Sequence, residues 1–318
     1  YKSDESKTRF GLNEDEKKNI MKLKKKLDEC QKAFDCSDDK LFLLKSGELN
    51  DAAKNNQVYP DDFIDELNII EKSAIFINTF RDPSIILNIL VSLKYIFNIS
   101  DYAIHLFISS NPSNLLLLIL QEPVIQIRIT IYQIMQTVCR LEEGIEYIIT
   151  SPLIEYCFNT IIELFEYLEK DTRAMQSDED AAIQLLNILI KIVKESPQGT
   201  KENIGTFVNI CDHCINSQRN FIFLKCGVKI LAHLLKNEFF DDILNSNLFS
   251  QIMIYLQDER YQSMHKRCLK LATYITYYPV EFMEEYRIIE QIPIEFIMSY
   301  FIRSDDKKII LECINILL

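Results

Sequence analysis

The chain has 318 residues, 48% of them apolar, and carries a net charge of −12 with a pI near 5.0. This apolar fraction excludes a mainly disordered chain, and the acidity argues against a protein that coats nucleic acid. The sequence contains 6 glycines and 8 prolines. So few glycines disfavour a sheet-rich fold with many tight turns, and helices are favoured instead.

Residues 1–59 predict a charged helical segment. Asn13 precedes three acidic residues and can cap the first turn of a helix. Apolar residues then recur at spacings of three and four, at Ile20, Leu23, Leu27, Cys30 and Phe34. We expect this segment to cap a repeat domain of residues 60–318. The alternative is a helix that dimerises or binds a partner.

Beyond residue 60, long apolar-rich helices are predicted at 84–99, 123–138, 180–195, 219–235, 260–276 and 306–318. A turn with acidic residues, serine or proline precedes each, as expected for a helix N-terminus. Two shorter helical pieces separate successive long helices, for example "GIEYIITS" and "PLIEYCFNTIIELFEYL". The sequence therefore predicts a repeat of short, medium and long helices.

Alignment of the long helices defines one equivalent position in each repeat. The residues at this position are Lys94, Gln133, Asn187, Lys229, Lys270 and Asn315. The intervals are 39, 54, 42, 41 and 45 residues, and the longest contains the polar insertion "EKDTRAMQSDED". We expect this insertion, residues 169–180, to form a mobile loop. The alternative is a single globular helical bundle with fortuitous spacing.

The period and composition resemble the armadillo/HEAT class of repeat proteins. The segment "AAIQLLNILIKI" is similar to the third helix of an armadillo repeat, with Asn187 where that family often has a groove-lining asparagine. Asn315 in "ECINILL" matches as well. The resemblance implies an all-α fold, a right-handed armadillo/HEAT-like superhelical solenoid of about five or six three-helix repeats. Because the sequence stops inside an apolar helical run, we expect the repeat domain to be truncated at its C-terminal end.

Candidate chemistry is sparse, and we expect no enzyme activity, no cofactor and no small-molecule substrate. Cys211, Cys214, Cys226 and His233 have a spacing that a zinc site could use. The two cysteines of "CDHC" also follow helical core spacing, which favours small apolar fillers over metal ligands. No nucleophile elbow and no glycine-rich phosphate loop occurs.

The nine cysteines and the absence of a long apolar run bear on location. The cysteines are scattered among apolar neighbours, which indicates free thiols in a reducing, cytoplasmic environment. The longest uninterrupted apolar run, "LLLLIL", is too short to cross a bilayer, so we expect no transmembrane segment.

Charge is unevenly distributed between the long helices and the rest of the chain. The six predicted long helices contain 13 lysines and arginines against 4 aspartates and glutamates, a net +9, which leaves −21 elsewhere. If the third helices line a concave groove, as the resemblance implies, that groove is basic. The candidate binding residues are Lys94, Gln133, Asn187, Lys225, Lys229, Lys266, Arg267, Lys270 and Asn315.

The favoured function is a non-enzymatic scaffold or adaptor that binds an acidic or phosphorylated protein segment. Similar solenoids occur in vesicle tethers, formins and chaperone exchange factors, and no motif selects among these roles. One alternative is that the lysines only form ion pairs with neighbouring helices. Another is a nucleic-acid-binding solenoid, which we consider unlikely because the net charge is negative and aromatic residues do not alternate with the lysines.

Overall fold

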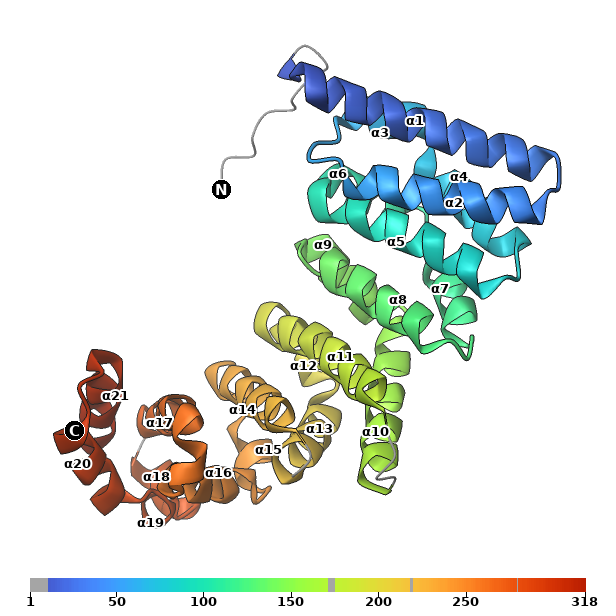
Figure 1. The fold of residues 1–318 in the computed structure, drawn as a ribbon. Coiled ribbons are helices and arrows are strands. Elements are labelled where there is room, and N and C mark those ends of the chain that lie inside the picture. Colours follow the sequence, from blue (N-terminus) through green and yellow to red (C-terminus); the bar gives the residue numbers. More distant parts are fainter. Residues whose placement is uncertain (1–10, 171–174, 218–219, 279) are drawn as a thin grey trace. The chain divides into compact units, whose positions relative to one another are not determined.

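The computed structural model describes residues 11–170, 175–217, 220–278 and 280–318 (Figure 1). Every regular element in these ranges is a helix. Two compact units divide the chain, one of residues 1–157 and 175–184 and the other of residues 158–174 and 185–318. No single helix in the described ranges is long and apolar enough to cross a membrane, whereas two bent helix pairs reach that length and composition together.

Unit 1 begins with a hairpin of α1 (Glu14–Asp35) and α2 (Asp39–Lys54). Two three-helix repeats follow in the same unit. They consist of α3 (Asp61–Leu67), α4 (Ile69–Thr79) and α5 (Pro83–Ile99), then α6 (Asp101–Ser109), α7 (Ser113–Leu120) and α8 (Ile125–Val138). A third repeat contains α9 (Glu142–Thr150), α10 (Leu153–Lys170) and α11 (Gln176–Glu195), of which α10 and α11 each contribute residues to both units.

Unit 2 continues the order of short, medium and long helices. Its first repeat consists of α12 (Pro197–Lys201), α13 (Ile204–Asn216) and α14 (Phe221–Lys236). The second consists of α15 (Phe240–Leu244), α16 (Leu248–Gln257) and α17 (Gln262–Thr276). In the last, two short helices, α18 (Val280–Glu285) and α19 (Ile288–Gln291), precede α20 (Ile294–Arg303) and α21 (Lys307–Leu317). Six such repeats in the described residues confirm the predicted all-α repeat architecture. The right-handed superhelix and the domain boundary at residue 60 stay predictions.

Each unit is held together by contacts between its long helices. In unit 1, α5 lies between α2 and α8 (Figure 1), and in unit 2, α17 lies between α14 and α21. Five of the long helices, namely α5, α8, α14, α17 and α21, also pack on the medium helix of their own repeat. The long helices are therefore buried on more than one face. Each fully buried leucine, isoleucine or phenylalanine contributes about 1.5–3 kcal/mol.

The predicted acidic capping residues are found at α5 and α21, whereas α17 has no side-chain cap. The Asp82 carboxylate accepts a hydrogen bond from the Ser84 backbone amide at 2.8 Å, and Pro83 occupies the first turn of α5. Asp306 caps α21 in the same way. The prediction is wrong at α8, because the helix begins at Ile125, two residues after Pro123, with no side-chain cap. A proline fits before a helix as well as in its first turn, since neither position needs its amide hydrogen.

The predicted loop at 169–180 is wrong at both ends. Residues 169–170 belong to α10 and residues 176–180 belong to α11. Residues 171–174 of the expected loop lie outside the described residues. Acidic side chains at Asp178 and Glu179 stand in the first turn of α11, where they complement the helix dipole. The acidic residues that suggested a loop, Asp178 and Glu179, therefore belong to a helix N-terminus.

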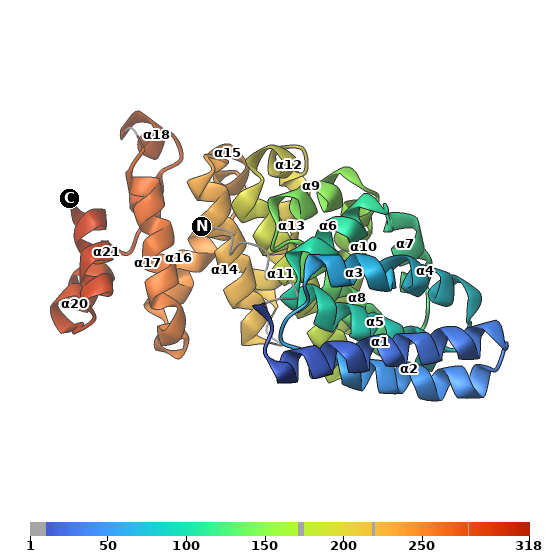
Figure 2. The ribbon, with the colours of Figure 1, turned by 90° about the horizontal axis from the view of Figure 1, so that it is seen from above.

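The N-terminal hairpin buries the apolar stripe expected for the first helix. Ile20, Leu23, Leu27 and Cys30 are buried in unit 1, where α1 packs on α2 and α2 on α5 (Figure 2). Phe34 is half-exposed, although its ring lies 5.2 Å from that of Phe76. Asn13 caps α1 through the Glu16 amide at 2.8 Å. The stripe is therefore covered within its own unit.

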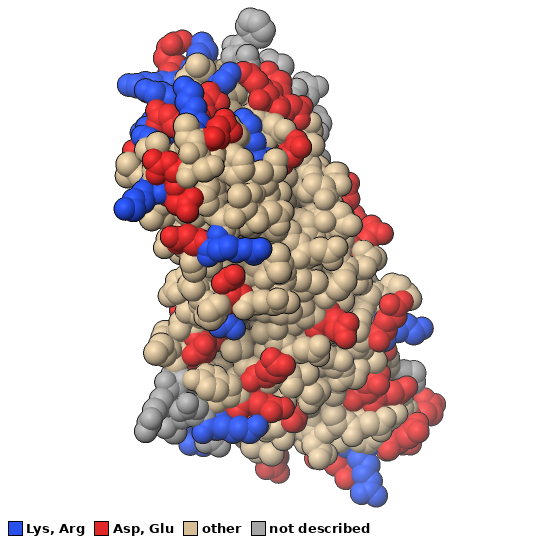
Figure 3. Space-filling model, turned by 90° about the vertical axis from the view of Figure 1, so that its right-hand side faces the viewer, with Lys and Arg blue, Asp and Glu red and all other residues tan. Residues whose placement is uncertain are grey.

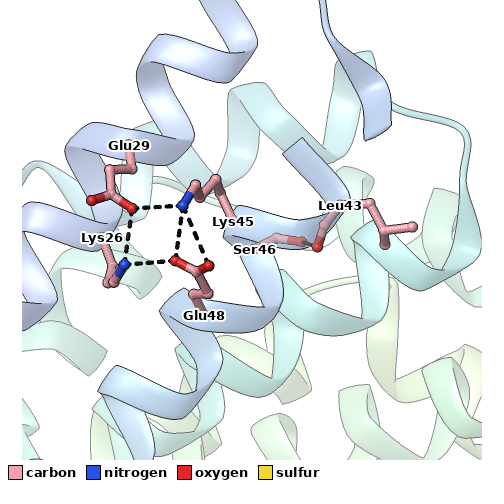
Figure 4. A network of polar contacts seen from close by, with 6 residues as sticks. All are labelled: Lys26, Glu29, Leu43, Lys45, Ser46 and Glu48. Carbon is pink, nitrogen blue, oxygen red and sulfur yellow. Dashed lines mark hydrogen bonds and ion pairs between the residues drawn. The ribbon is translucent and has the colours of Figure 1, made fainter. Parts of the chain in front are cut away.

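A ring of four charged side chains joins the two helices of the hairpin (Figure 4). Lys26 contacts Glu29 at 2.9 Å and Glu48 at 2.6 Å. Lys45 contacts both carboxylates at 3.1 Å. Hydrogen bonds from Lys26 and Lys45 lower the pKa of Glu29 from 4.5 to about 2. Since the folded pKa is depressed, the ring stabilises the hairpin above pH 4.5 and this contribution is lost as the pH falls towards 2.

We expect Glu29→Gln to destabilise the α1–α2 hairpin at neutral pH and to have a much smaller effect near pH 2.5. Amide hydrogen exchange of α1 and α2 in the wild type and the variant measures the difference at each pH. Glu14→Gln is the control, because Glu14 pairs with Lys17 on the surface of the same helix and is not part of the ring. An effect of Glu29→Gln that is the same at both pH values would contradict the role of the ring.

Gly227 sets the distance between α13 and α14. A Cβ atom at this position would lie 2.7 Å from the Cβ of Cys214 and 3.3 Å from a side-chain carbon of Ile215. The Cys211 thiol contacts the Gly227 carbonyl oxygen at 3.7 Å. Because the two helices meet backbone to side chain here, a larger residue must push them apart.

We therefore expect Gly227→Ala to lower the free energy of unfolding by about 1–3 kcal/mol through overpacking. Gly205→Ala is the matched control, since nothing lies within 4 Å of a Cβ atom at that helical position. Chemical denaturation of both variants measures the difference. Equal stability of the two variants would show that α13 and α14 are not packed as described.

Candidate binding surface

The outward faces of α14 and α17 form a basic surface in unit 2. The two helices contact each other and bury their apolar sides, including Leu231 on α14 and Leu271 on α17. Neither helix contains an aspartate or glutamate. The residues of the basic surface are Lys225, Lys229, Lys236, Lys266, Arg267 and Lys270. All except Lys225, which is half-buried, are exposed.

His233 lies within this surface and reports its positive potential. Partial burial lowers its pKa below 6.5, and the nearby charges of Lys229, Lys194, Lys236 and Lys270 lower it further. Lys270 belongs to α17, whereas His233 belongs to α14. The cations of the two helices therefore act on the same region, and the imidazole is kept neutral at physiological pH.

The basic surface is mostly not neutralised by carboxylates of its own unit. Lys266 forms an ion pair with Asp306 at 3.5 Å. Within the described ranges, Lys225, Lys229, Arg267 and Lys270 have no carboxylate oxygen within 4.0 Å. The alternative that these cations serve only as ion-pair partners therefore fits Lys266 and does not fit Lys225, Lys229, Arg267 and Lys270.

Two of the cations lie over aromatic rings, which the sequence analysis missed. The Lys225 ammonium is 4.6 Å from the centre of the Phe221 ring, and that of Lys270 is 5.7 Å from the Tyr274 ring. Each pair is four residues apart on one helix, and that spacing was the available signal. Cation–π attraction holds the ammonium groups near the helix surface. Phe221 also stacks on Tyr261, with ring centres 6.1 Å apart.

The remaining predicted binding residues lie on other helices than the basic surface. Lys94 and Gln133 form a pair of their own in unit 1, where the Lys94 ammonium donates to the Gln133 amide oxygen at 3.2 Å. Burial lowers the pKa of Lys94. Asn187 on α11 and Asn315 on α21 are half-buried. Their assignment to a common groove stays a prediction.

The cysteines of the zinc-like spacing lie in the core of unit 2. Cys211 and Cys214 are fully buried on α13, and Cys226 is buried on α14. Burial raises the pKa of each thiol, for Cys226 to about 11. No group of three or more histidine, cysteine, aspartate or glutamate side chains in the described part of the chain is arranged to hold a metal ion.

Acidic side chains are prominent on the face of the molecule that Figure 3 shows. One face of the molecule shows acidic residues scattered over a largely uncharged surface below the mixed charges of the N-terminal hairpin (Figure 3). This agrees with a chain of net charge −12 whose α14 and α17 carry six cations. The basic surface is thus a local exception on an acidic protein.

Known structures share the fold, although no protein-family model and no curated protein matches the chain. A designed armadillo repeat protein for modular peptide recognition is 11% identical, with a TM-score of 0.60 over 79% of this chain and 99% of that one. A designed armadillo repeat protein in complex with the peptide (KR)4 is 12% identical, with a TM-score of 0.59 over 78% and 98%. An engineered protein covers 93% of this chain and 67% of its own at a TM-score of 0.64 and 13% identity. The chain therefore has the all-α solenoid fold of armadillo/HEAT-type proteins.

The register of α11 can be tested at two adjacent residues. Leu186 is fully buried, whereas Asn187 is half-exposed. We expect Leu186→Ala to lower the free energy of unfolding by about 2–5 kcal/mol because it leaves a cavity. Asn187→Ala should change it by less than about 0.5 kcal/mol. Equal losses in denaturant titrations would show that the helix faces are assigned wrongly.

Proposed function

We propose that the protein is a non-enzymatic interaction scaffold or adaptor whose basic surface binds an acidic or phosphorylated segment of a protein partner. The observation that carries this proposal is the set of six cations on α14 and α17, two helices that contain no aspartate or glutamate. Four of these cations have no carboxylate partner within the described ranges. Carboxylates or phosphates of a bound protein segment would pair with these cations through charge-assisted hydrogen bonds.

The fold suits a partner that binds in an extended form. Successive long helices present the same face at each repeat, so a linear segment can contact several helices in turn. A designed relative in fold was solved with the peptide (KR)4, which consists of lysine and arginine. The basic surface has the same sign of charge as that ligand, so we propose that its partner segment carries the opposite charge and is acidic.

Nucleic acid remains the second candidate, and the positions of the aromatic rings argue against it. Base stacking requires free ring faces. Lys225 and Lys270 lie over Phe221 and Tyr274, so the ammonium groups already occupy one face of each ring. A protein segment needs only the cations. We therefore favour a protein partner.

We propose a cytoplasmic location for this scaffold. Eight of the nine cysteines are buried as free thiols and Cys36 is exposed as one. Free thiols are typical of a reducing environment. This supports the proposal without naming a pathway, and tether, formin-type and chaperone-cofactor roles are all compatible with it.

The charge-reversed double variant Lys229→Glu/Lys270→Glu tests the proposal. The probe is a peptide in which aspartate and glutamate replace the lysine and arginine of (KR)4, with a phosphoserine version beside it. We expect the variant to bind at least about tenfold more weakly, since two charge pairs become repulsive. Fluorescence anisotropy measures the affinities.

The NMR titration of His233 should show its pKa rising when the wild type binds the acidic peptide, because an anion offsets the charges of the surrounding lysines.

Lys40→Glu/Lys54→Glu is the matched control, with the same change in net charge at exposed positions of α2. It should bind the acidic peptide almost as the wild type does. If the control and the test variant lose affinity equally, only the net charge matters and the basic surface is not the site. Steeply salt-dependent binding of an oligonucleotide, with no binding of either peptide, would favour the nucleic-acid alternative.

A further inference from the structure

A second, chemically different surface lies in unit 1, where the helix turns of two successive repeats meet. The α3–α4 turn and the α6–α7 turn enclose an open cavity of about 630 Å³. Asn68 and Asn111 stand in these turns with φ angles of 48° and 49°. Asparagine tolerates this left-handed conformation better than most residues. The chain changes direction at these turns, by 91° between α6 and α7, and the space between the two repeats stays open.

The inner wall of the cavity is apolar. Ile70 and Ala74 from α4 and Leu106 and Leu115 from α6 and α7 line it. A smaller cavity of about 20 Å³ shares Ile70, Ala74 and Leu115 and reaches the core. Leu118 also lines the larger cavity and is 47% exposed. The size falls within the range of cavities that bind ligands, and an apolar side chain could be buried there.

The charge of the rim points to the kind of occupant. Asp65 and Glu71 line the cavity, and among the described residues no lysine, arginine or histidine lines it. The Asp65 carboxylate accepts hydrogen bonds from the neutral Tyr102 hydroxyl at 2.8 and 2.9 Å, and Glu71 accepts from the Asn68 amide. Among the described residues, no cation forms an ion pair with Asp65 or Glu71. Both negative charges are therefore held in place by neutral donors and remain uncompensated.

We propose that this cavity docks a protein segment in which an apolar side chain is flanked within about one helical turn by lysine or arginine. The apolar side chain is buried against Ile70 and Leu115, and the cations pair with Asp65 and Glu71. Carboxylates at the rim would repel the phosphates of nucleic acid and of an anionic membrane surface. This surface is distinct from the basic surface of unit 2. It selects a basic partner segment, whereas the basic surface selects an acidic one.

The test selects a random-peptide library displayed on phage against the full chain and reads the enriched sequences. Peptides with an apolar residue flanked by lysine or arginine should be enriched. The same peptides, made synthetically, should bind Asp65→Lys/Glu71→Lys at least about tenfold more weakly. They should bind Leu118→Ala about three- to fivefold more weakly, because part of the apolar contact is removed.

Glu146→Lys/Glu155→Lys is the matched control, with the same change in charge at exposed positions of unit 1 outside the cavity. Thermal unfolding of all variants shows whether they remain folded. Enriched peptides that bind the control and the Asp65→Lys/Glu71→Lys variant equally would overturn the proposal. So would a wild-type protein that dimerises while the rim variant is monomeric, because a second copy would then be the occupant. Acidic peptides alone among those enriched would overturn it too, while supporting the basic surface.

Discussion

The contact between successive long helices is the constraint on which the rest of the structure depends. In unit 2, the positions of α14 that face its neighbours are Phe223, Leu224, Val228, Ile230 and Leu231, and all are buried. Forty-one residues later, α17 buries Met264, His265, Leu269, Leu271 and Ala272. The helical period then leaves one face free in each repeat. Charges can accumulate on that face without disturbing the core, and they do so at Lys229 and Lys270.

The sequence predicted the repeat because the long helices need two buried sides and are therefore unusually apolar. It did not predict α2. Ser46 is fully buried on this helix, where its hydroxyl donates to the Leu43 carbonyl oxygen and accepts from the Asn88 amide, at 2.9 and 3.1 Å. A polar residue and the adjacent Gly47 at the packed face hide the apolar pattern. Tertiary contacts from the next repeat satisfy this polarity, and a local pattern cannot show them.

The candidate site shows the same division between local and distant information. The spacing of lysines on α14 and α17 predicted one basic face, and the structure leaves all of them except the half-buried Lys225 exposed; their common role in binding stays a prediction. Sequence could not show that Lys266 is paired while Lys229 has no carboxylate partner among the described residues, because Asp306 comes from the next repeat, 40 residues away. The cavity in unit 1 was missed altogether. It depends on the left-handed conformation of Asn68 and Asn111, and asparagine adopts that conformation in only some turns.

Residues at one aligned position of a repeat need not share a function. Lys94 and Lys229 were aligned, yet Lys94 is half-buried and hydrogen-bonded to Gln133. Burial disfavours the charged form of Lys94, as its lowered pKa shows, and the neutral amide of Gln133 compensates part of that cost. Lys94 thus links the long helices of two neighbouring repeats. Lys229 has no such partner among the described residues and is exposed. One aligned position therefore holds a cation that contributes to packing in one repeat, Lys94, and an exposed cation in another, Lys229.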